Sequence, residues 1–222
     1  MPSTSISRIL IVDDHPLLRE GLTQRLQREP DLRVCGEAAT APEAIVAVET
    51  HKPDLVIVDI SLPGRDGIEL TKDLRARFPK MKILVLSLHD ESLYAERALR
   101  AGASGYLMKH ETPEKLIAAV RSVLAGEFIV GNGALIQLLR RFSAGRDSTD
   151  PATKLSDREL QVFRLLGQKH SRRQIATMIN LSLKTVETHC SNIRRKLGLN
   201  DAAALVQAAV EFATRDTNHF TR

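Results

Sequence analysis

Five polar residues, each at or just after the end of a short apolar run, are the first candidates for chemistry in this sequence: Asp13, Asp14, Asp59, Ser87 and Lys109. Three carboxylates held close together repel one another, and a hard divalent cation with oxygen ligands relieves that repulsion. Mg²⁺ fits best, because it binds through one or two carboxylates and leaves room for phosphate oxygens. Asp59 could then attack phosphorus to form an aspartyl-phosphate, while Lys109 and Ser87 contact the developing charge. Alternatively, Asp59 is an exposed loop residue and Lys109 forms an ordinary ion pair.

These residues meet only if the apolar runs are strands of one sheet. The runs predict strands over residues 8–12, 32–38, 54–59, 82–86 and 105–108. Leucine spacing and capping residues predict helices that begin near Pro16, Thr40, Ile68, Ser92 and Thr112. Strands that alternate with helices predict an α/β fold with a flavodoxin-like, doubly wound five-stranded parallel sheet of order 2-1-3-4-5. Ligands of such sheets bind outside the carboxyl ends of the strands, where all five residues would converge.

The composition is that of a globular protein with two domains. The chain has 222 residues, of which 43% are hydrophobic and 27% charged, and no apolar run approaches the roughly 20 residues of a membrane span. No signal-peptide pattern precedes the first strand, so we expect a cytoplasmic protein without membrane contact. Cys35 and Cys190 lie far apart without metal-ligand spacing, which argues against a disulfide framework or a zinc site.

The net charge is unevenly distributed along the chain. Residues 1–128 hold 17 Lys and Arg against 19 Asp and Glu, a net charge of −2, whereas residues 129–222 hold 15 against 8, a net charge of +7. This asymmetry indicates a polyanion partner for the C-terminal part only, although a charged run alone is usually a solvated face.

The sequence changes character after Gly126. Residues 134–142 can form a short helix, and residues 143–151 are polar, small and rich in turn formers, as in a linker. Ser156, Ser171 and Ser182 then cap three helices, of which the last two form a helix-turn-helix. We therefore predict a first domain over residues 1–127, a linker with a short helix over residues 128–153, and an all-α second domain over residues 154–222.

The last helix of this motif has one apolar and one polar face. Its apolar side chains recur at helical spacing at Val186, Cys190, Ile193 and Leu197. The polar face suits the major groove of double-stranded DNA, where early residues meet base edges and later arginines meet phosphates. The predicted DNA contacts are Lys184, Thr185, Glu187, Thr188, Ser191, Arg194 and Arg195. A polar face is more often simply solvated, which the pattern alone leaves open.

Residues 8–127 resemble a two-component receiver domain. The resemblance rests on the acid pair after the first strand, Asp59 with Leu-Pro-Gly and Asp66-Gly67 behind it, Ser87, and Lys109 at the end of Gly105-Tyr106-Leu107-Met108. It implies that Asp59 is the phosphoacceptor and that a histidine kinase is the phosphodonor. It also implies Mg²⁺ ligation by Asp14 directly, by Asp13 through water, and by the backbone carbonyl of Ser61. Ser87 and Tyr106 would form the switch pair, and His110 stands where many receivers have proline.

The C-terminal part resembles a LuxR-type DNA-binding domain. The matching segments are Leu155-Ser156-x-Arg158-Glu159, Ile175-Ala176, Leu183 to His189, and Arg195-Lys196-Leu197-Gly198. The family's usual glycine before the second helix is Lys169 here, and its usual glutamate in that helix is Gln174. The final helix, residues 201–212, resembles the family's dimerisation helix, with Leu205, Ala209 and Phe212 on one stripe. Packing into the domain core explains that stripe equally well.

The whole chain therefore resembles a NarL/FixJ family response regulator. We expect a transcription factor rather than an enzyme, in which phosphorylation of Asp59 favours a homodimer on two DNA half-sites. Two alternatives stay open. One is a phosphorylation-independent regulator whose receiver is a dimer scaffold. The other is an aspartyl-nucleophile phosphohydrolase, although Ser61 stands where its second acid would be.

Overall fold

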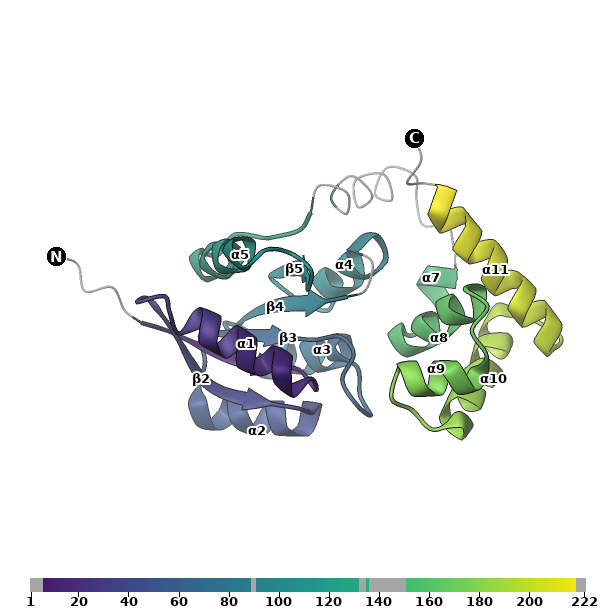
Figure 1. Cartoon of the computed structure of the whole chain (residues 1–222), viewed down its shortest axis with the longest axis horizontal. Coiled ribbons are helices and arrows are strands. Elements are labelled where there is room, and N and C mark those ends of the chain that lie inside the picture. The colour runs from purple at the N-terminus through teal and green to yellow at the C-terminus, as the bar shows by residue number, and fades with distance from the viewer. Residues whose placement is uncertain (1–5, 89–90, 132–134, 136–150, 219–222) are drawn as a thin grey trace. The chain divides into compact units, whose positions relative to one another are not determined.

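A computed structural model describes residues 6–88, 91–131, 135 and 151–218 (Figure 1). The chain divides into two compact units, residues 1–144 and 145–222. Apart from Leu135, the predicted short helix over residues 134–142 lies outside the described residues, and so does most of the predicted linker. Among the described helices, none is long and apolar enough to cross a membrane.

The N-terminal unit is a five-stranded sheet of order β2-β1-β3-β4-β5, and every pair of neighbouring strands is parallel. This confirms the predicted sheet and its strand order. In chain order the elements are β1 (Ser7–Val12), α1 (Pro16–Leu26), β2 (Leu32–Ala38), α2 (Ala41–His51), β3 (Leu55–Val58), α3 (Gly67–Arg77), β4 (Lys82–Ser87), α4 (Glu91–Arg100), β5 (Gly105–Met108) and α5 (Pro113–Ala125).

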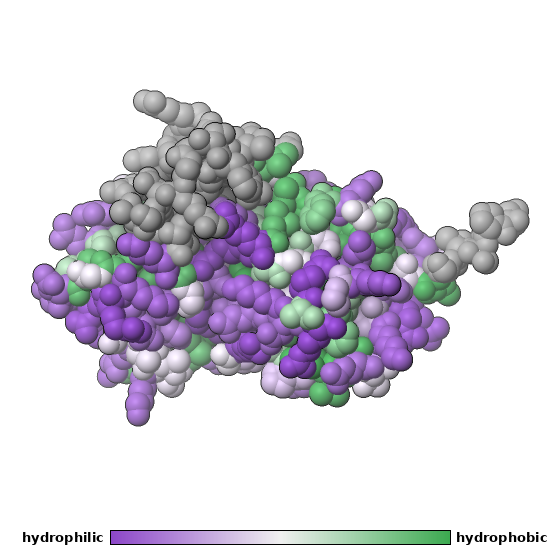
Figure 2. Space-filling model, turned by 180° about the vertical axis from the view of Figure 1, so that it is seen from behind, coloured by the Kyte–Doolittle hydropathy of each residue, from purple (hydrophilic) through white to green (hydrophobic). Residues whose placement is uncertain are grey.

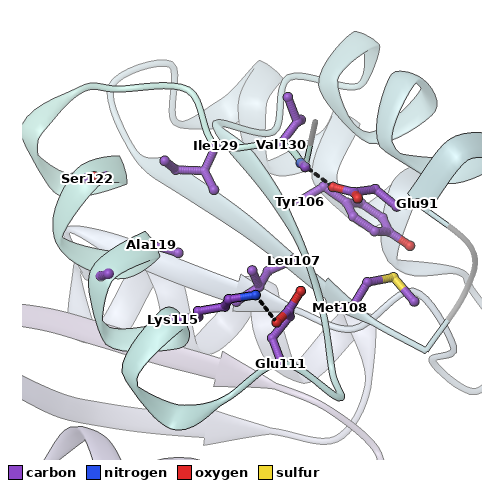
Figure 3. A pocket seen from close by; sticks show the side chains of 12 residues that line it. Glu91, Tyr106, Leu107, Met108, Glu111, Lys115, Ala119, Ser122, Ile129 and Val130 are labelled. Carbon is purple, nitrogen blue, oxygen red and sulfur yellow. Dashed lines mark hydrogen bonds and ion pairs between the residues drawn. The ribbon is translucent and has the colours of Figure 1, made fainter. Parts of the chain in front are cut away.

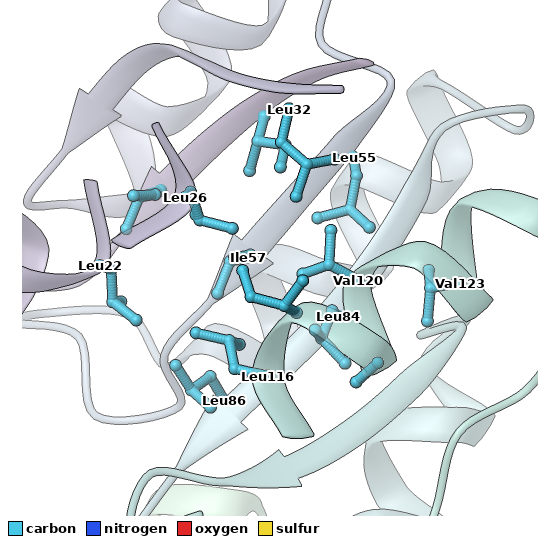
Figure 4. Packing of buried hydrophobic residues seen from close by; sticks show 14 residues of the cluster. Leu22, Leu26, Leu32, Leu55, Ile57, Leu84, Leu86, Leu116, Val120 and Val123 are labelled. Carbon is cyan, nitrogen blue, oxygen red and sulfur yellow. The ribbon is translucent and has the colours of Figure 1, made fainter. Parts of the chain in front are cut away.

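Helices cover both faces of this sheet. On one face, strand residues such as Leu55 and Ile57 pack against the apolar stripes of α1 and α5 (Figure 4). On the other, residues such as Leu10 and Val58 pack against α2 and α3. All four residues of β3 are buried, as expected for a central parallel strand with two covered faces. Most apolar side chains of the strands are buried, and the face in Figure 2 is largely hydrophilic.

The turn after β3 holds Asp59 in place through a close backbone contact. Gly67 donates its N–H to the carbonyl of Ile60 at 2.9 Å. A Cβ on Gly67 would overlap the carbonyl oxygen of Asp59, so only glycine allows this approach. Asp66 caps α3 by accepting the N–H groups of Ile68 and Glu69, both at 2.9 Å. The predicted loop is therefore a rigid support for the strand end.

The C-terminal unit is helical in its described part, as predicted. Its elements are α7 (Pro151–Lys154), α8 (Asp157–Gly167), α9 (Arg172–Met178), α10 (Leu183–Leu197) and α11 (Ala202–Asn218). Ser156 and Ser171 each form a complete capping box, and Ser182 accepts the N–H of Thr185. Helix α11 extends to Asn218, past the predicted end at Phe212.

The structure corrects the prediction that Leu205, Ala209 and Phe212 form a dimer contact. These side chains are only 1%, 0% and 8% exposed within a single chain. The ring of Phe212 lies 5.5 Å from that of Phe163 on α8. A Cβ on Gly167 would overlap the carbonyl of Ala209, so α8 and α11 approach backbone to backbone. The stripe is covered by its own domain, which was the alternative, and it is not available to a second copy.

Candidate functional sites

Four strand ends bring the first group of candidate residues together. Asp13, Asp59, Ser87 and Lys109 follow or end β1, β3, β4 and β5, which are consecutive in the sheet. Asp13 and Asp59 are each 2% exposed, Ser87 is fully buried, and the side chain of Lys109 is 5% exposed. Lys109 Nζ lies 2.7 Å from Asp13 Oδ2 and 2.9 Å from Asp59 Oδ2. One ammonium group therefore bridges two buried carboxylates.

Asp14 and His15 complete the rim of this site. His15 donates its backbone N–H to Asp13 Oδ1 at 2.8 Å, and its Nδ1 lies 2.7 Å from Asp14 Oδ1. Asp13, Asp14, His15 and Asp59 can each offer one ligand atom within 4.8 Å of the others. The three acids were predicted to converge, whereas His15 was missed. Its position directly after the acid pair was the only signal in the sequence.

The site holds more negative than positive charge. Burial raises the pKa of Asp59, Lys109 lowers it, and Asp13 raises it, so that the pKa lies above its ordinary value. Lys109 Nζ lies 2.9 Å from Asp59 Oδ2, and His15 Nδ1 lies 2.7 Å from Asp14 Oδ1. Three carboxylates therefore cluster around a single ammonium group. Such an excess of carboxylate oxygens fits a hard divalent cation.

Ser87 and Tyr106 lie on the neighbouring strands β4 and β5, and both are fully buried. Ser87 ends β4 at the carboxyl edge, opposite Met108, whereas Tyr106 lies two residues further from that edge, opposite Val85. Ser61 is half-buried and follows Ile60 in the turn after β3. Its carbonyl as a metal ligand stays a prediction. No described peptide bond is cis, so the chain passes from Lys109 to His110 in the ordinary trans form.

Helix α10 has the two faces that its sequence predicts. Val186, Cys190 and Ile193 are at most 3% exposed, whereas Leu197 is half-buried. Of the seven predicted DNA contacts, five are exposed, namely Lys184, Glu187, Thr188, Ser191 and Arg195. The other two, Thr185 and Arg194, are half-buried. All seven are therefore reachable from solvent on one side of α10.

The family follows from two matches along the chain. Residues 9–121 match the model of the response regulator receiver domain, and residues 153–209 match that of the bacterial regulatory proteins of the luxR family. The chain is a NarL/FixJ family response regulator. Members of this family are DNA-binding transcriptional regulators rather than enzymes, which agrees with the sequence-based expectation.

Several relatives match this chain over nearly their whole length. The chain is 35% identical to the transcriptional regulatory protein DegU of Brevibacillus brevis, covering 92% of each, and 35% identical to the oxygen regulatory protein NreC of Staphylococcus aureus, covering 92% of this chain and 97% of NreC. It is 27% identical to RcsB from Salmonella enterica serovar Typhimurium, solved bound to the promoter rprA with phosphomimetic BeF₃⁻; the match covers 91% and 98% of the two chains at a TM-score of 0.59. Another RcsB structure contains two dimers bound to two parallel DNAs, with 26% identity, coverage of 94% and 99%, and a TM-score of 0.58.

The response regulator departs from its family at Lys169, and the backbone there shows why glycine is usual. Lys169 has φ +67°, in the left-handed region that disfavours side chains with a Cβ. The change to Gln174 has no such cost, because Gln174 accepts the N–H of Ser171 at 2.8 Å and completes the capping box.

We expect Lys169→Gly to stabilise the C-terminal unit by about 0.5–1 kcal/mol, because it removes left-handed strain that outweighs the added freedom of the unfolded chain. Urea denaturation would show a higher midpoint. The reciprocal control is Gly198→Ala. Gly198 has φ +68° and no atom lies within 4 Å of a Cβ added there, so the substitution introduces left-handed strain without a steric clash. The urea midpoint of this variant should therefore fall. A lower midpoint for Lys169→Gly would contradict this account.

An ion pair between a buried acid and a partly exposed lysine joins α8 to α10 of the response regulator. Lys196 Nζ lies 2.6 Å from Glu159 Oε2, which also accepts the N–H of Ser156 at 2.8 Å. Burial raises the pKa of Glu159, but hydrogen bonds from Lys196 and Ser156 lower it by more, and the net pKa is below its ordinary value. This pair was not predicted, because its members are far apart in the chain and carry no local pattern.

The stabilisation from this pair should disappear in acid. Because the folded pKa of Glu159 is lowered, its contribution is complete above the unfolded value of about 4.3 and is lost as the pH falls through the folded value. Glu159→Gln should therefore cost about 1.5–3 kcal/mol at pH 7, and the cost should shrink as the pH falls below the unfolded pKa of about 4.3 toward the folded pKa. Denaturation at pH 7 and near pH 3 tests this, with the exposed Glu211→Gln as control. An equal loss at both pH values would refute the role of the charge.

Proposed function

We propose that this response regulator is a transcription factor whose DNA binding is controlled by phosphorylation of Asp59, with a partner histidine kinase as phosphodonor. The observation that carries the proposal is the buried Lys109 bridge between Asp13 and Asp59, at 2.7 and 2.9 Å. An ordinary surface ion pair would be exposed to solvent, whereas Asp13, Asp59 and the side chain of Lys109 are buried. Because its proposed partner is DNA, we also propose that the protein acts in the cytoplasm.

The carboxyl edge supplies the groups that phosphoryl transfer needs. Asp59 acts as nucleophile: one carboxylate oxygen forms the bond to phosphorus while the phosphodonor's bond to phosphorus breaks. Lys109 and the Ser87 hydroxyl stabilise the charge on the phosphoryl oxygens. Mg²⁺, bound by Asp14 and Asp59, by Asp13 through water and by the Ser61 carbonyl, would neutralise the remaining negative charge. The clustering of Asp13, Asp14 and Asp59, whose ligand atoms lie within 4.8 Å of one another, supports this ligand set.

The switch would act through two buried side chains on neighbouring strands. The Ser87 hydroxyl moves toward the phosphoryl group, and the ring of Tyr106 follows inward. Coupling of this kind typically amounts to about 1–3 kcal/mol, so phosphorylation would shift a pre-existing equilibrium rather than create a new state.

The C-terminal unit would place α10 in the major groove of DNA as a homodimer. The seven predicted contact residues lie on its accessible side, and the promoter-bound and dimeric RcsB structures support this arrangement. Residues 1–127, 128–153 and 154–222 stay our proposed domains and linker. Since Leu205, Ala209 and Phe212 are buried, the dimer contact must use other residues.

DNA binding by α10 should depend steeply on salt, because each neutralised phosphate releases counterions. Arg195→Ala should weaken binding to a mixed-sequence duplex and reduce the slope of log K against log salt by about 0.9, the value for one lost phosphate contact. Fluorescence anisotropy over a salt series measures the slope. Arg33→Ala, an exposed arginine on β2 of the other unit, should leave the slope unchanged. A salt-independent affinity would contradict the proposed interface.

A further inference from the structure

The residues directly after α5 form an additional edge on the sheet of the N-terminal unit. Ile129 pairs with Gly105 as a parallel bridge beside β5. Tyr106 donates its N–H to the carbonyl of Ile129 at 2.8 Å, and Ile129 donates its own N–H to the carbonyl of Ser104 at 3.2 Å. The first residues of the proposed linker therefore cover the exposed edge of β5.

One side chain reaches this segment from a different element. Glu91, the first residue of α4, accepts the N–H of Gly131 with its carboxylate (Figure 3). A Cβ on Gly131 would overlap that carboxylate, so any larger residue at 131 would push the Glu91 side chain away from this contact. The contact is charge-assisted, and such hydrogen bonds are stronger than neutral ones.

One apolar side chain and several polar contacts hold the segment. Ile129 is half-buried and packs against the core cluster beneath α5, whereas Phe128 is 73% exposed. A hollow of about 290 Å³ lies against the segment, lined by Glu91, Tyr106, Ile129 and Gly131 among others. Because Gly131 adds no apolar side chain, the end of the segment depends on its charge-assisted hydrogen bond to Glu91.

The docked segment contacts Tyr106 of the proposed switch pair directly, and its link to Ser87 runs through Glu91. Glu91 begins α4 shortly after Ser87 ends β4, and Tyr106 on β5 binds Ile129 through its backbone. We infer that Glu91 and the edge of β5 form a docking site for residues 128–131, which is weakened when the switch pair responds to phosphorylation. This inference rests on the proposed function for its trigger, but the docking site itself does not.

Amide hydrogen exchange in the full chain tests the docking site without phosphorylation. Glu91→Ala should speed exchange of the Gly131 N–H about ten- to hundredfold, the range for losing a hydrogen bond to a charged group. Glu111→Ala is the matched control, since Glu111 lines the same hollow but pairs with Lys115 at 2.8 Å. Gly131→Ala removes the contact from the other side and should speed exchange of the Ile129 N–H. Unchanged exchange in both variants would overturn the inference.

Beryllofluoride, a phosphoryl mimic, tests the coupling. With Mg²⁺ it should speed exchange of the Gly131 and Ile129 N–H groups in the wild-type chain. In Asp59→Asn it should have no effect. In Glu91→Ala the Gly131 N–H already exchanges fast, so the mimic should not speed it further. Bound ¹⁹F signals show separately whether Asp59 has taken up the mimic. Uptake without faster exchange would overturn the coupling, whereas absence of uptake would contradict the proposed function and leave the Glu91→Ala result to decide the docking site.

Discussion

Asp59→Asn is expected to reduce phosphate incorporation from a small phosphodonor with Mg²⁺ to background. The amide retains the shape of the side chain but cannot act as the nucleophile. Asp13 cannot replace it, because its two oxygens already contact Lys109 and His15. Acid-labile labelling or intact mass spectrometry measures the incorporation.

The matched control for this variant is Asp54→Asn. Asp54 lies at the opposite end of the same strand, is exposed, and accepts the N–H of Arg8 at 2.8 Å. Asp54→Asn makes the same chemical change far from the carboxyl edge, so this variant should be labelled as much as wild type. Labelling that survives in Asp59→Asn would refute Asp59 as phosphoacceptor and favour a regulator that works without phosphorylation.

The same variant has a second readout in stability. Because burial raises the folded pKa of Asp59, its ionisation destabilises the folded state as the pH rises from about 3.9, the unfolded value, through the higher folded value. Asn carries no charge, so Asp59→Asn should be more stable than wild type at pH 7 and not at pH 3. At pH 7, Mg²⁺ should stabilise the wild type more than Asp59→Asn, so the difference in stability between the two proteins should become smaller.

Lys109→Met is expected to destabilise the N-terminal unit by about 3–5 kcal/mol at neutral pH, the usual cost of leaving a buried charge without its partner. The substitution leaves Asp13 and Asp59, both nearly inaccessible, with no compensating cation. Methionine retains most of the apolar volume, so the loss reports charge rather than packing. Chemical denaturation measures it.

Two comparisons make the Lys109 result specific. Lys115→Met breaks an exposed pair with Glu111 and should cost less than about 0.5 kcal/mol. Mg²⁺ should stabilise Lys109→Met by more than it stabilises wild type, because the cation replaces the missing positive charge beside the carboxylates. If both lysine variants lost equal stability, or Mg²⁺ helped both proteins equally, the bridging role of Lys109 would be wrong.

Much of the fold was predictable because its signals are local. Short apolar runs, capping serines and threonines, and prolines at helix starts each act over a few residues, and they specify strands and helices before any tertiary contact. The rule that ligands bind at the carboxyl ends of parallel strands then brought Asp13, Asp59 and Lys109 to one edge. The matching burial of these residues supports that step.

The sequence by itself determined the sheet order, the helix-turn-helix and the acidic edge around Asp59. Only the tertiary structure decided which groups pair across long separations: Lys109 with two acids, Glu159 with Lys196, and Glu91 with the backbone of Gly131. It also decided that the stripe containing Phe212 faces α8. An apolar stripe shows that one face of a helix is covered, but not which element covers it. A charged residue likewise does not show which residue it will pair with. In both cases the partner is far away in the sequence and is brought close only by the fold, so helical or strand periodicity cannot reveal it.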